Sequence, residues 1–301
     1  MNQSEPDIFE AHRPRLFGLA YRMLGSVADA EDLLQDAYLR WRSVAKDSVE
    51  NPRAYLSKIV SRLCLDRLKE ARRHREVYVG PWLPEPLAND LTHAVSPADD
   101  LAENISFALM LTLERLSPLE RAAFLLHDVF DMEFSEVADT LGRSEATCRQ
   151  LASRARTHVR KDRPRYAVEP EQTEKISTAF FAAMHSGDTN ALRSLLADDA
   201  VFHADGGGKA RSARNILHGA DRISQFLAGY ARKALPKRIE WSRRMTINNL
   251  PGELAFAVDG ILQTTAIEIA HGRITAIYVT RNPDKLRHLA SFAPQASSRL
   301  D

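Results

Sequence analysis

Residues 205–211 read Asp-Gly-Gly-Gly-Lys-Ala-Arg, and three glycines followed by a lysine suggest a loop that binds phosphate. A nucleotide-hydrolysing loop of the form G-x-x-x-x-G-K-[ST] needs a further glycine five positions before the last one and a hydroxyl after the lysine. His203 and Ala210 occupy those two positions. The match fails at two of the four fixed positions, so the sequence argues against nucleotide hydrolysis.

A second kind of chemistry is indicated by segregated charge. Residues 53–75 hold eight Lys and Arg against two Asp and Glu, and residues 149–165 hold seven against one. Residues 85–145, between them, hold three against thirteen, although the whole chain has a net charge of +1. Two basic segments separated by an acidic one suggest two contacts with a polyanion, while two solvated helix faces are the alternative.

The first basic segment requires a helix to position it. Asn51-Pro52 predicts a helix start, with Asn as the cap and Pro at the first helical position, and Trp41 and Tyr55 supply aromatic rings nearby. Before it, Asp29 is expected to cap a helix that runs to about Ser43. That helix would turn one apolar face inward and carry an acidic outer face at helical spacing.

The second basic segment falls in a predicted helix-turn-helix. Ser117 is expected to cap one helix, and residues 135–141 form a short helix that ends at Gly142. Ser144 then caps a last helix with a basic polar face. A short helix, a tight turn and a basic helix suit entry into a DNA groove, while a plain helical hairpin is the alternative.

Two proline-containing stretches separate these helices from each other and from the rest of the chain. Residues 77–104 read as a linker in which Trp82 and Leu83 are expected to dock on another surface, and residues 162–170 form a second boundary. Residues 171–291 predict helices followed by consecutive strands. This order indicates an α+β domain with a curved antiparallel sheet covered by helices.

Composition excludes several classes of protein. No run of about 18 apolar residues is present, so a membrane span is not expected, and the polar, acidic start of the chain is unlike a signal peptide. Cys64 and Cys148 lie far apart without metal-ligand spacing. We therefore expect a cytoplasmic protein with two reduced core cysteines and with no metal or cofactor.

A family resemblance rests on several of these motifs. Asp29-Ala-Glu-Asp-Leu-Leu-Gln-Asp-Ala-Tyr-Leu-Arg-Trp41 and residues 51–67 resemble region 2 of bacterial extracytoplasmic-function (ECF) sigma factors, and residues 116–147 resemble sigma region 4. Trp82-Leu-Pro-Glu-Pro86, Asp205-Gly-Gly-Gly-Lys209 and Asn282-Pro-Asp-Lys-Leu286 are similar to motifs of the SigJ-like group, whose members carry a fused C-terminal SnoaL-like domain. The resemblance implies a multidomain chain: sigma region 2 (residues 1–76), the linker (77–104), region 4 (105–163) and a SnoaL-like α+β cone (171–291).

The resemblance also implies roles in transcription initiation for particular residues. Residues that would bind the clamp helices of the RNA polymerase β′ subunit are Asp29, Asp32, Gln35 and Asp36. Residues that would lie at the −10 element of promoter DNA are Arg53, Lys58, Arg62, Arg67 and Lys69. Residues that would read the −35 element are Arg143, Ser144, Thr147, Arg149, Gln150, Ser153 and Arg154.

In this family the C-terminal domain is thought to control the sigma domains in place of a separate anti-sigma protein. Glycines would let backbone approach another surface, and Lys209 would pair with an acid there. The residues assigned to this regulatory contact are Trp82, Leu83, Pro84, Asp205, Gly206, Gly207, Gly208, Lys209, Asn282, Pro283 and Asp284. A tight turn with an ordinary docked tryptophan, and a simple helix start at Asn282, are the alternatives.

Catalysis is not expected. His203, Asp205, Asp259 and His271 could serve a SnoaL-like pocket, but no spacing pairs them and no nucleophile motif is present. Binding of a small ligand in the C-terminal domain stays open. The resemblance favours a sigma factor that is monomeric when free and binds core polymerase and promoter DNA. The alternative is a ligand-sensing DNA-binding regulator that acts without polymerase.

Overall fold

The computed structural model describes residues 5–44, 49–75, 78–88, 105–161, 169–233, 239–257 and 260–293. Its contacts divide the chain into two compact units: Met1–Val77 with Asp90–Arg163, and Tyr78–Asn89 with Pro164–Asp301. The described linker residues, Tyr78–Ala88, therefore belong to the second unit; we call them the linker segment.

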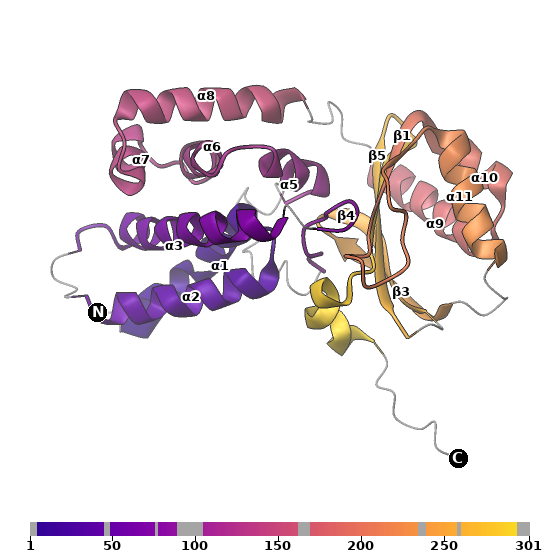
Figure 1. Ribbon diagram of the computed structural model, residues 1–301, viewed down its shortest axis with the longest axis horizontal. Coiled ribbons are helices and arrows are strands. Elements are labelled where there is room, and N and C mark those ends of the chain that lie inside the picture. The colour runs from indigo at the N-terminus through magenta and orange to yellow at the C-terminus, as the bar shows by residue number, and fades with distance from the viewer. Residues whose placement is uncertain are drawn as a thin grey trace, which may run out of the picture. The chain divides into compact units, whose positions relative to one another are not determined.

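The first unit begins with three helices, α1 (Glu5–Leu24), α2 (Val27–Arg42) and α3 (Pro52–Arg75) (Figure 1). Ser26 caps α2, and its hydroxyl accepts a hydrogen bond from the Asp29 backbone N–H at 3.1 Å. The expected cap at Asp29 is therefore wrong. The start of α3 is confirmed, because the Asn51 side chain accepts from the Ala54 N–H at 3.1 Å.

The first unit continues with α5 (Phe107–Glu114), α6 (Pro118–Phe124), the π-helical turn η3 (Leu125–Val129), α7 (Phe134–Leu141) and α8 (Glu145–Lys161). Ser117 and Glu120 form a reciprocal capping box at α6. Gly142 ends α7 with φ of 62°, and the Ser144 hydroxyl accepts from the Thr147 N–H. The predicted helix-turn-helix is confirmed in α7 and α8.

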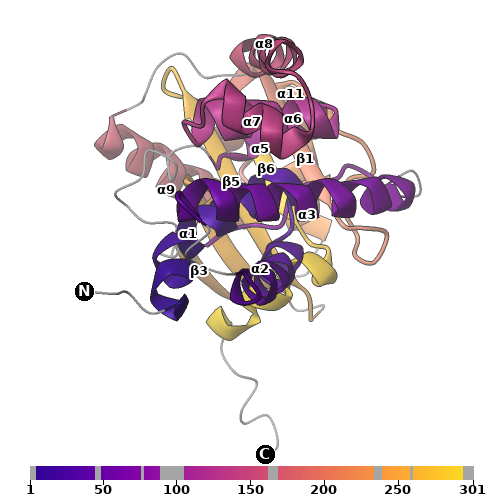
Figure 2. The same ribbon diagram turned by 90° about the vertical axis from the view of Figure 1, so that its left-hand side faces the viewer.

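Within the first unit, α3 lies against α6 and α7 (Figure 2). Cys64 of α3 and Cys148 of α8 are buried free thiols, as predicted, and burial raises the pKa of each. None of the helices in the described part of the chain is both long and apolar enough to cross a membrane.

The second unit contains the helices α9 (Pro170–Ser186), α10 (Thr189–Leu195) and α11 (Ala220–Lys233). Its strands are β1 (Leu196–Asp205), β2 (Leu217–His218), β3 (Ile239–Ile247), β4 (Leu250–Ala257), β5 (Leu262–Ala270) and β6 (Arg273–Thr280). The chain then forms the 3-10 helix η4 (Pro283–Phe292).

The sheet order is β2-β1-β6-β5-β4-β3. Four pairings are antiparallel, but β1 pairs with β6 in parallel. The described sheet is therefore mixed, and the expectation of a purely antiparallel sheet fails at this one pairing. The physical reason is that α11 and the later strands lie between β1 and β6 in the sequence, which gives the chain room for a crossover.

The α9, α10 and α11 helices cover one face of the curved sheet (Figure 1). Apolar residues of the helices and strands meet there, including Phe180, Leu192, Phe202, Ile223 and Ile277. This core fixes the end of β1, where Asp205 begins the glycine loop, next to the end of β6, where Asn282 begins η4.

Candidate functional site

The acidic face of α2 is largely open to solvent. Asp32, Gln35 and Asp36 are exposed and Asp29 is half-buried, whereas Leu33 and Leu34 turn into the core. Leu39 is 60% exposed, one helical turn after Asp36. Sequence reasoning missed Leu39, although an apolar residue outside the inward stripe of an otherwise regular amphipathic helix is a readable signal.

Three of the cations assigned to DNA lie on α3 and contact residues between α6 and α8. Lys58 Nζ donates to the Asp139 carboxylate at 2.5 Å. Arg62 donates to the Asp139 and Thr140 carbonyls, each at 3.3 Å, and Arg53 donates to the Phe130 carbonyl at 2.8 Å. A phosphate contact by these side chains would compete with these bonds.

For the other two α3 cations assigned to DNA, Arg67 and Lys69, no bond to η3 or α7 is seen among the described residues. Arg67 is half-buried, and Lys69 is exposed and pairs with Asp66 on its own helix at 2.9 Å. Trp41 is 1% exposed and packs near the Tyr55 ring, with 6.1 Å between ring centroids. Trp41 is thus a core residue in this arrangement, whereas Tyr55, which lies on α3, is half-buried.

The polar face of the helix-turn-helix is exposed at Arg143, Ser144, Gln150, Ser153 and Arg154. Thr147 is half-buried, and its hydroxyl shares a hydrogen bond with that of Ser144. Arg149 is already engaged, because it pairs with Glu145 at 2.6 Å and lies over Phe134, 5.2 Å from the ring centroid. A DNA contact by Arg149 would compete with this pair.

The glycine loop is a turn that closes on its own backbone. The Gly206 carbonyl accepts from the N–H groups of Lys209 and Ala210 at 2.9 and 3.0 Å. Gly207 and Gly208 both have positive φ, 57° and 72°. A Cβ on Gly207 would collide with the Asn282 side-chain amide, and one on Gly208 would lie 3.2 Å from Val79. The loop therefore needs glycine for conformation and for close approach.

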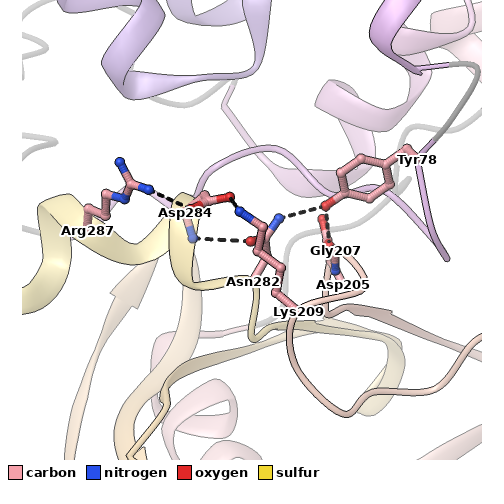
Figure 3. Close-up of polar contacts among 7 residues, drawn as sticks. All are labelled: Tyr78, Asp205, Gly207, Lys209, Asn282, Asp284 and Arg287. Carbon is pink, nitrogen blue, oxygen red and sulfur yellow. Dashed lines mark hydrogen bonds and ion pairs between the residues drawn. The ribbon is translucent and has the colours of Figure 1, made fainter.

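Asp205 is the centre of a buried polar cluster that binds the linker segment (Figure 3). Its Oδ1 accepts from the Tyr78 hydroxyl at 2.5 Å and from the Gly207 N–H at 3.0 Å. Its Oδ2 accepts from the Leu83 N–H at 2.9 Å and from Lys285 Nζ at 2.7 Å. Asp205 has no solvent exposure, so four donors replace its hydration.

Lys285 and Asn282 complete what we call the Asp205 cluster. Lys285 Nζ also donates to the Leu83 carbonyl at 2.5 Å and lies 4.4 Å from the centroid of the Trp82 ring. Asn282 donates to the Tyr78 hydroxyl at 3.0 Å and accepts from the Asp284 N–H, which caps η4 (Figure 3). Burial, followed by the hydrogen bond to Asp205, raises the pKa of the Tyr78 hydroxyl.

The later part of the linker segment is held through hydrogen bonds to its own backbone groups. The Pro86 carbonyl contacts His288 Nε2 at 2.8 Å. Leu87 exchanges hydrogen bonds with Asn248, at 2.9 and 2.8 Å, and Ala88 forms an antiparallel bridge with Ile247. The segment is therefore attached from Tyr78 to Ala88, and Pro84 within it is buried.

An exposed ion-pair group lies at the edge of the cluster. Asp284 accepts from Lys209 and, at 2.6 Å, from Arg287 (Figure 3). These two cations lower the pKa of the Asp284 carboxyl, with the Lys209 hydrogen bond the larger cause. Lys209 therefore pairs with an acid, Asp284. This acid lies near the start of η4, in the same domain as Lys209, and not on a separate surface as the sequence suggested.

The residues considered for catalysis lie in different surroundings. Asp205 is the centre of the cluster, and Asp259 is outside the described residues. The His203 ring stacks on Tyr278, whose hydroxyl donates to Glu268 at 2.8 Å, and burial raises the pKa of the Glu268 carboxyl. Among the described residues, no group of three or more His, Cys, Asp or Glu could hold a metal ion.

The geometry describes a class of protein: two helical modules, one with a helix-turn-helix, joined by a linker that an α+β domain binds. Comparison with protein families agrees. Residues 8–74 match Sigma-70 region 2, residues 106–159 match Sigma-70 region 4, and residues 177–277 match a SnoaL-like domain.

Curated relatives cover nearly the whole chain. It is 40% identical over 287 residues to the ECF RNA polymerase sigma factor SigJ of Mycobacterium tuberculosis, covering 92% of this chain and 91% of that protein. It is 33% identical over 298 residues to the probable ECF sigma factor SigI of the same species, covering 95% and 97%. The crystal structure of M. tuberculosis SigJ aligns with a TM-score of 0.76 and 38% identity, covering 93% of this chain and 97% of that one.

The chain therefore belongs to the ECF RNA polymerase sigma factors that carry a C-terminal SnoaL-like domain. Membership assigns it to promoter-specific initiation of transcription with RNA polymerase, and the alternative of a regulator that acts without polymerase is not favoured.

The cluster geometry makes a prediction for Asp205→Asn. Loss of the carboxylate removes the negative charge that the buried Lys285 ammonium contacts, and breaking a buried ion pair in this way costs about 3–5 kcal/mol. We expect the hydrogen-exchange protection of the Leu87 amide, which bonds to Asn248 rather than to Asp205, to fall about 100-fold or more. Asp284→Asn, which removes an exposed acid from the neighbouring pair, should change this protection by less than about fivefold. Equal effects of the two variants would contradict the assignment.

Proposed function

We propose that this sigma factor works in the cytoplasm, is monomeric when free, and divides its contacts among three helices. The acidic face of α2 binds the clamp helices of the polymerase β′ subunit. The basic face of α3 binds the −10 element, and the exposed face of α8 reads the −35 element. Family membership supports this division, and the exposure of Asp32, Gln35 and Asp36 is consistent with a docking role.

The α2 face also gains a candidate apolar contact. Leu39 follows Gln35 and Asp36 by one turn and is 60% exposed. An exposed leucine beside acids suits an interface whose centre excludes water while its charged rim fixes orientation. We include Leu39 in the polymerase-binding surface.

Control by the C-terminal domain is the second part of the proposal, and the Asp205 cluster is the observation that carries it. From Arg75 to Ile105, at the ends of the flanking helices, an extended chain could span about 100 Å. With the linker segment docked, its path over the second unit is fixed, and only the three residue steps from Arg75 to Tyr78 and the 17 from Ala88 to Ile105 can still extend, by about 10 and about 60 Å. Docking therefore limits the relative positions that the two DNA-binding modules can take.

A contact within the first unit adds a further restraint. Lys58, Arg62 and Arg53 donate to groups of η3, α7 and their flanks, as described above. These bonds compete with a −10 phosphate contact for the same three side chains. We propose that α3 and α7 separate when the holoenzyme binds its promoter.

We further propose that the SnoaL-like domain regulates and does not catalyse. Asp205, an acid considered for a catalytic role, has its two oxygens occupied by four donors from the linker segment and its own domain. Such a carboxylate has little capacity left for proton transfer to a substrate.

Core binding tests the α2 assignment. The double variant Asp32→Lys, Asp36→Lys should lose at least about 100-fold in affinity for core polymerase, because like charges would meet across the interface at a cost of several kcal/mol. The measurement is a fluorescence titration of labelled full-length chain with core enzyme. Glu171→Lys with Asp198→Lys, an equal charge change at exposed sites of the second unit, serves as the control. Unchanged core affinity of the first variant would remove the assignment.

Promoter binding tests the α3–α7 contact. Asp139→Asn should strengthen promoter binding by the reconstituted holoenzyme by up to about fivefold, since an exposed ion pair contributes up to about 1 kcal/mol. The Lys58 hydrogen bond lowers the pKa of Asp139, so the pair stabilises the contact above the ordinary aspartate pKa of about 4. Its contribution is lost as pH falls through the lowered pKa.

The matched control is Asp128→Asn, which removes an ion pair to Arg156 that does not involve α3. It should leave promoter affinity unchanged. A gain equal to that of Asp139→Asn would mean that the effect is one of net charge alone.

Run-off transcription tests the regulatory contact. Gly207→Val introduces a side chain that collides with Asn282. Gly260→Val introduces the same side chain at another glycine of positive φ, where no atom of the described residues lies within 4 Å of the added Cβ. We expect Gly207→Val to change the amount of promoter-specific transcript at least about threefold relative to Gly260→Val. The reason is that the collision displaces Asn282, which holds Tyr78, and so weakens docking of the linker segment by about 1 kcal/mol or more. The change should have the same direction as removal of residues 166–301. If the two glycine variants give the same amount of transcript, the glycine loop is only a tight turn and has no regulatory role.

A further inference from the structure

A pocket of about 460 Å³ lies beside the Asp205 cluster, entirely within the second unit. One side is formed by the linker segment and the other by the glycine loop and the residues that follow it. Its lining residues are Val79, Gly80, Gly208, Lys209, Ala210, Arg211, Ser212 and Arg214. The volume falls within the range of small-molecule sites, about 300–1,000 Å³.

The lining is strongly cationic. Lys209, Arg211 and Arg214 contribute three positive charges, and none of the eight lining residues is acidic. Lys209 is paired with Asp284. Within the described part of the chain, the Arg211 and Arg214 guanidinium groups have no hydrogen-bond or ion-pair partner, although the Arg211 backbone is held by Arg281 at 2.8 Å. Because these two guanidinium groups are not neutralised and their backbone is held in place, the pocket favours the binding of an anion.

The residue types narrow the class of anion. Guanidinium groups bind phosphate through paired N–H donors, and the Ser212 side chain adds a hydroxyl to the lining. Gly208 and Gly80 place no side chain in the way of a ligand, and Val79 and Ala210 offer small apolar surfaces. A phosphate group alone would leave most of the volume empty.

We propose that this pocket binds a small phosphate-bearing molecule, with Arg211 and Arg214 holding the phosphate. A concave site of this size suits a small ligand better than duplex DNA, which requires an extended surface. The absence of a metal-ligating hydroxyl after Lys209, noted in the sequence, fits binding without hydrolysis.

Ligand binding would act on the linker segment. Val79 and Gly80 belong to the segment, and the other lining residues belong to the domain on which it docks. The complete pocket therefore exists only in the docked state, and a ligand that requires both sides stabilises that state by mass action. The binding site itself does not depend on the proposed role in transcription.

The probe is inorganic pyrophosphate, titrated into the full-length chain by calorimetry at constant ionic strength. We expect saturable one-to-one binding, with an affinity that falls at least about tenfold in the double variant Arg211→Gln, Arg214→Gln. The reason is that the loss of one charge-assisted hydrogen bond is enough to lower the affinity about tenfold. Arg222→Gln, an exposed arginine on α11, is the control and should bind as the unmodified chain does. Bound pyrophosphate should also slow hydrogen exchange at the Leu83 and Leu87 amides.

Two results would overturn the proposal. One is no saturable binding of pyrophosphate; if the pocket variant then also loses affinity for duplex DNA, these arginines are a DNA contact. The other is binding that the pocket variant and the Arg222 control weaken equally. Circular dichroism of each variant checks that its fold is retained. A failed transcription assay would leave these binding results standing.

Discussion

The second unit depends on a buried carboxylate that must be matched. Asp205 has no solvent exposure, and an unpaired charge there would cost several kcal/mol. Its four donors come from the linker segment, the glycine loop and η4, which are far apart in the sequence. Satisfying one side chain therefore brings three segments together. The sequence motifs around Trp82, Asp205 and Asn282 are separate in the chain because each supplies a different part of this one cluster.

In this arrangement the linker segment is part of a folded domain and not a free spacer. A proline-containing stretch between two helical modules would ordinarily act as a semi-rigid spacer. Here Tyr78–Ala88 forms part of the C-terminal domain, held by side chains at one end and by a backbone bridge to β3 at the other. Under the proposed regulation, the spacing available to the modules would depend on whether the C-terminal domain keeps its contact with this segment. A shift in that equilibrium requires only a ligand or partner that distinguishes the two states.

Local signals predicted much of this structure, and long-range ones did not. Caps at Asn51, Ser117 and Ser144 placed helix starts correctly, because a cap acts within one turn. The parallel pairing of β1 with β6 and the two-residue β2 depend on contacts between distant segments, which periodicity does not encode. Among the cluster residues, Asp205 and Asn282 were assigned to the regulatory contact by resemblance. Lys285 lies in one of the motifs that carried the resemblance but was given no role, and Tyr78 lies outside those motifs. A tyrosine and a lysine give no local sign that they will meet a carboxylate more than 75 residues away.

The two restraints on the DNA-binding modules differ in strength, and this difference suggests an order of events. The α3–α7 contact is made by exposed or half-buried groups, whose pairs contribute about 1 kcal/mol or less each. Under the proposed −10 role of α3, a DNA phosphate would replace Asp139 as the partner of Lys58, so promoter DNA would displace this contact directly. The Asp205 cluster is buried, and no DNA group substitutes for its donors. Under the same proposal, promoter binding would open the α3–α7 contact while the Asp205 cluster persists, and release of the linker segment would then need a signal received by the C-terminal domain.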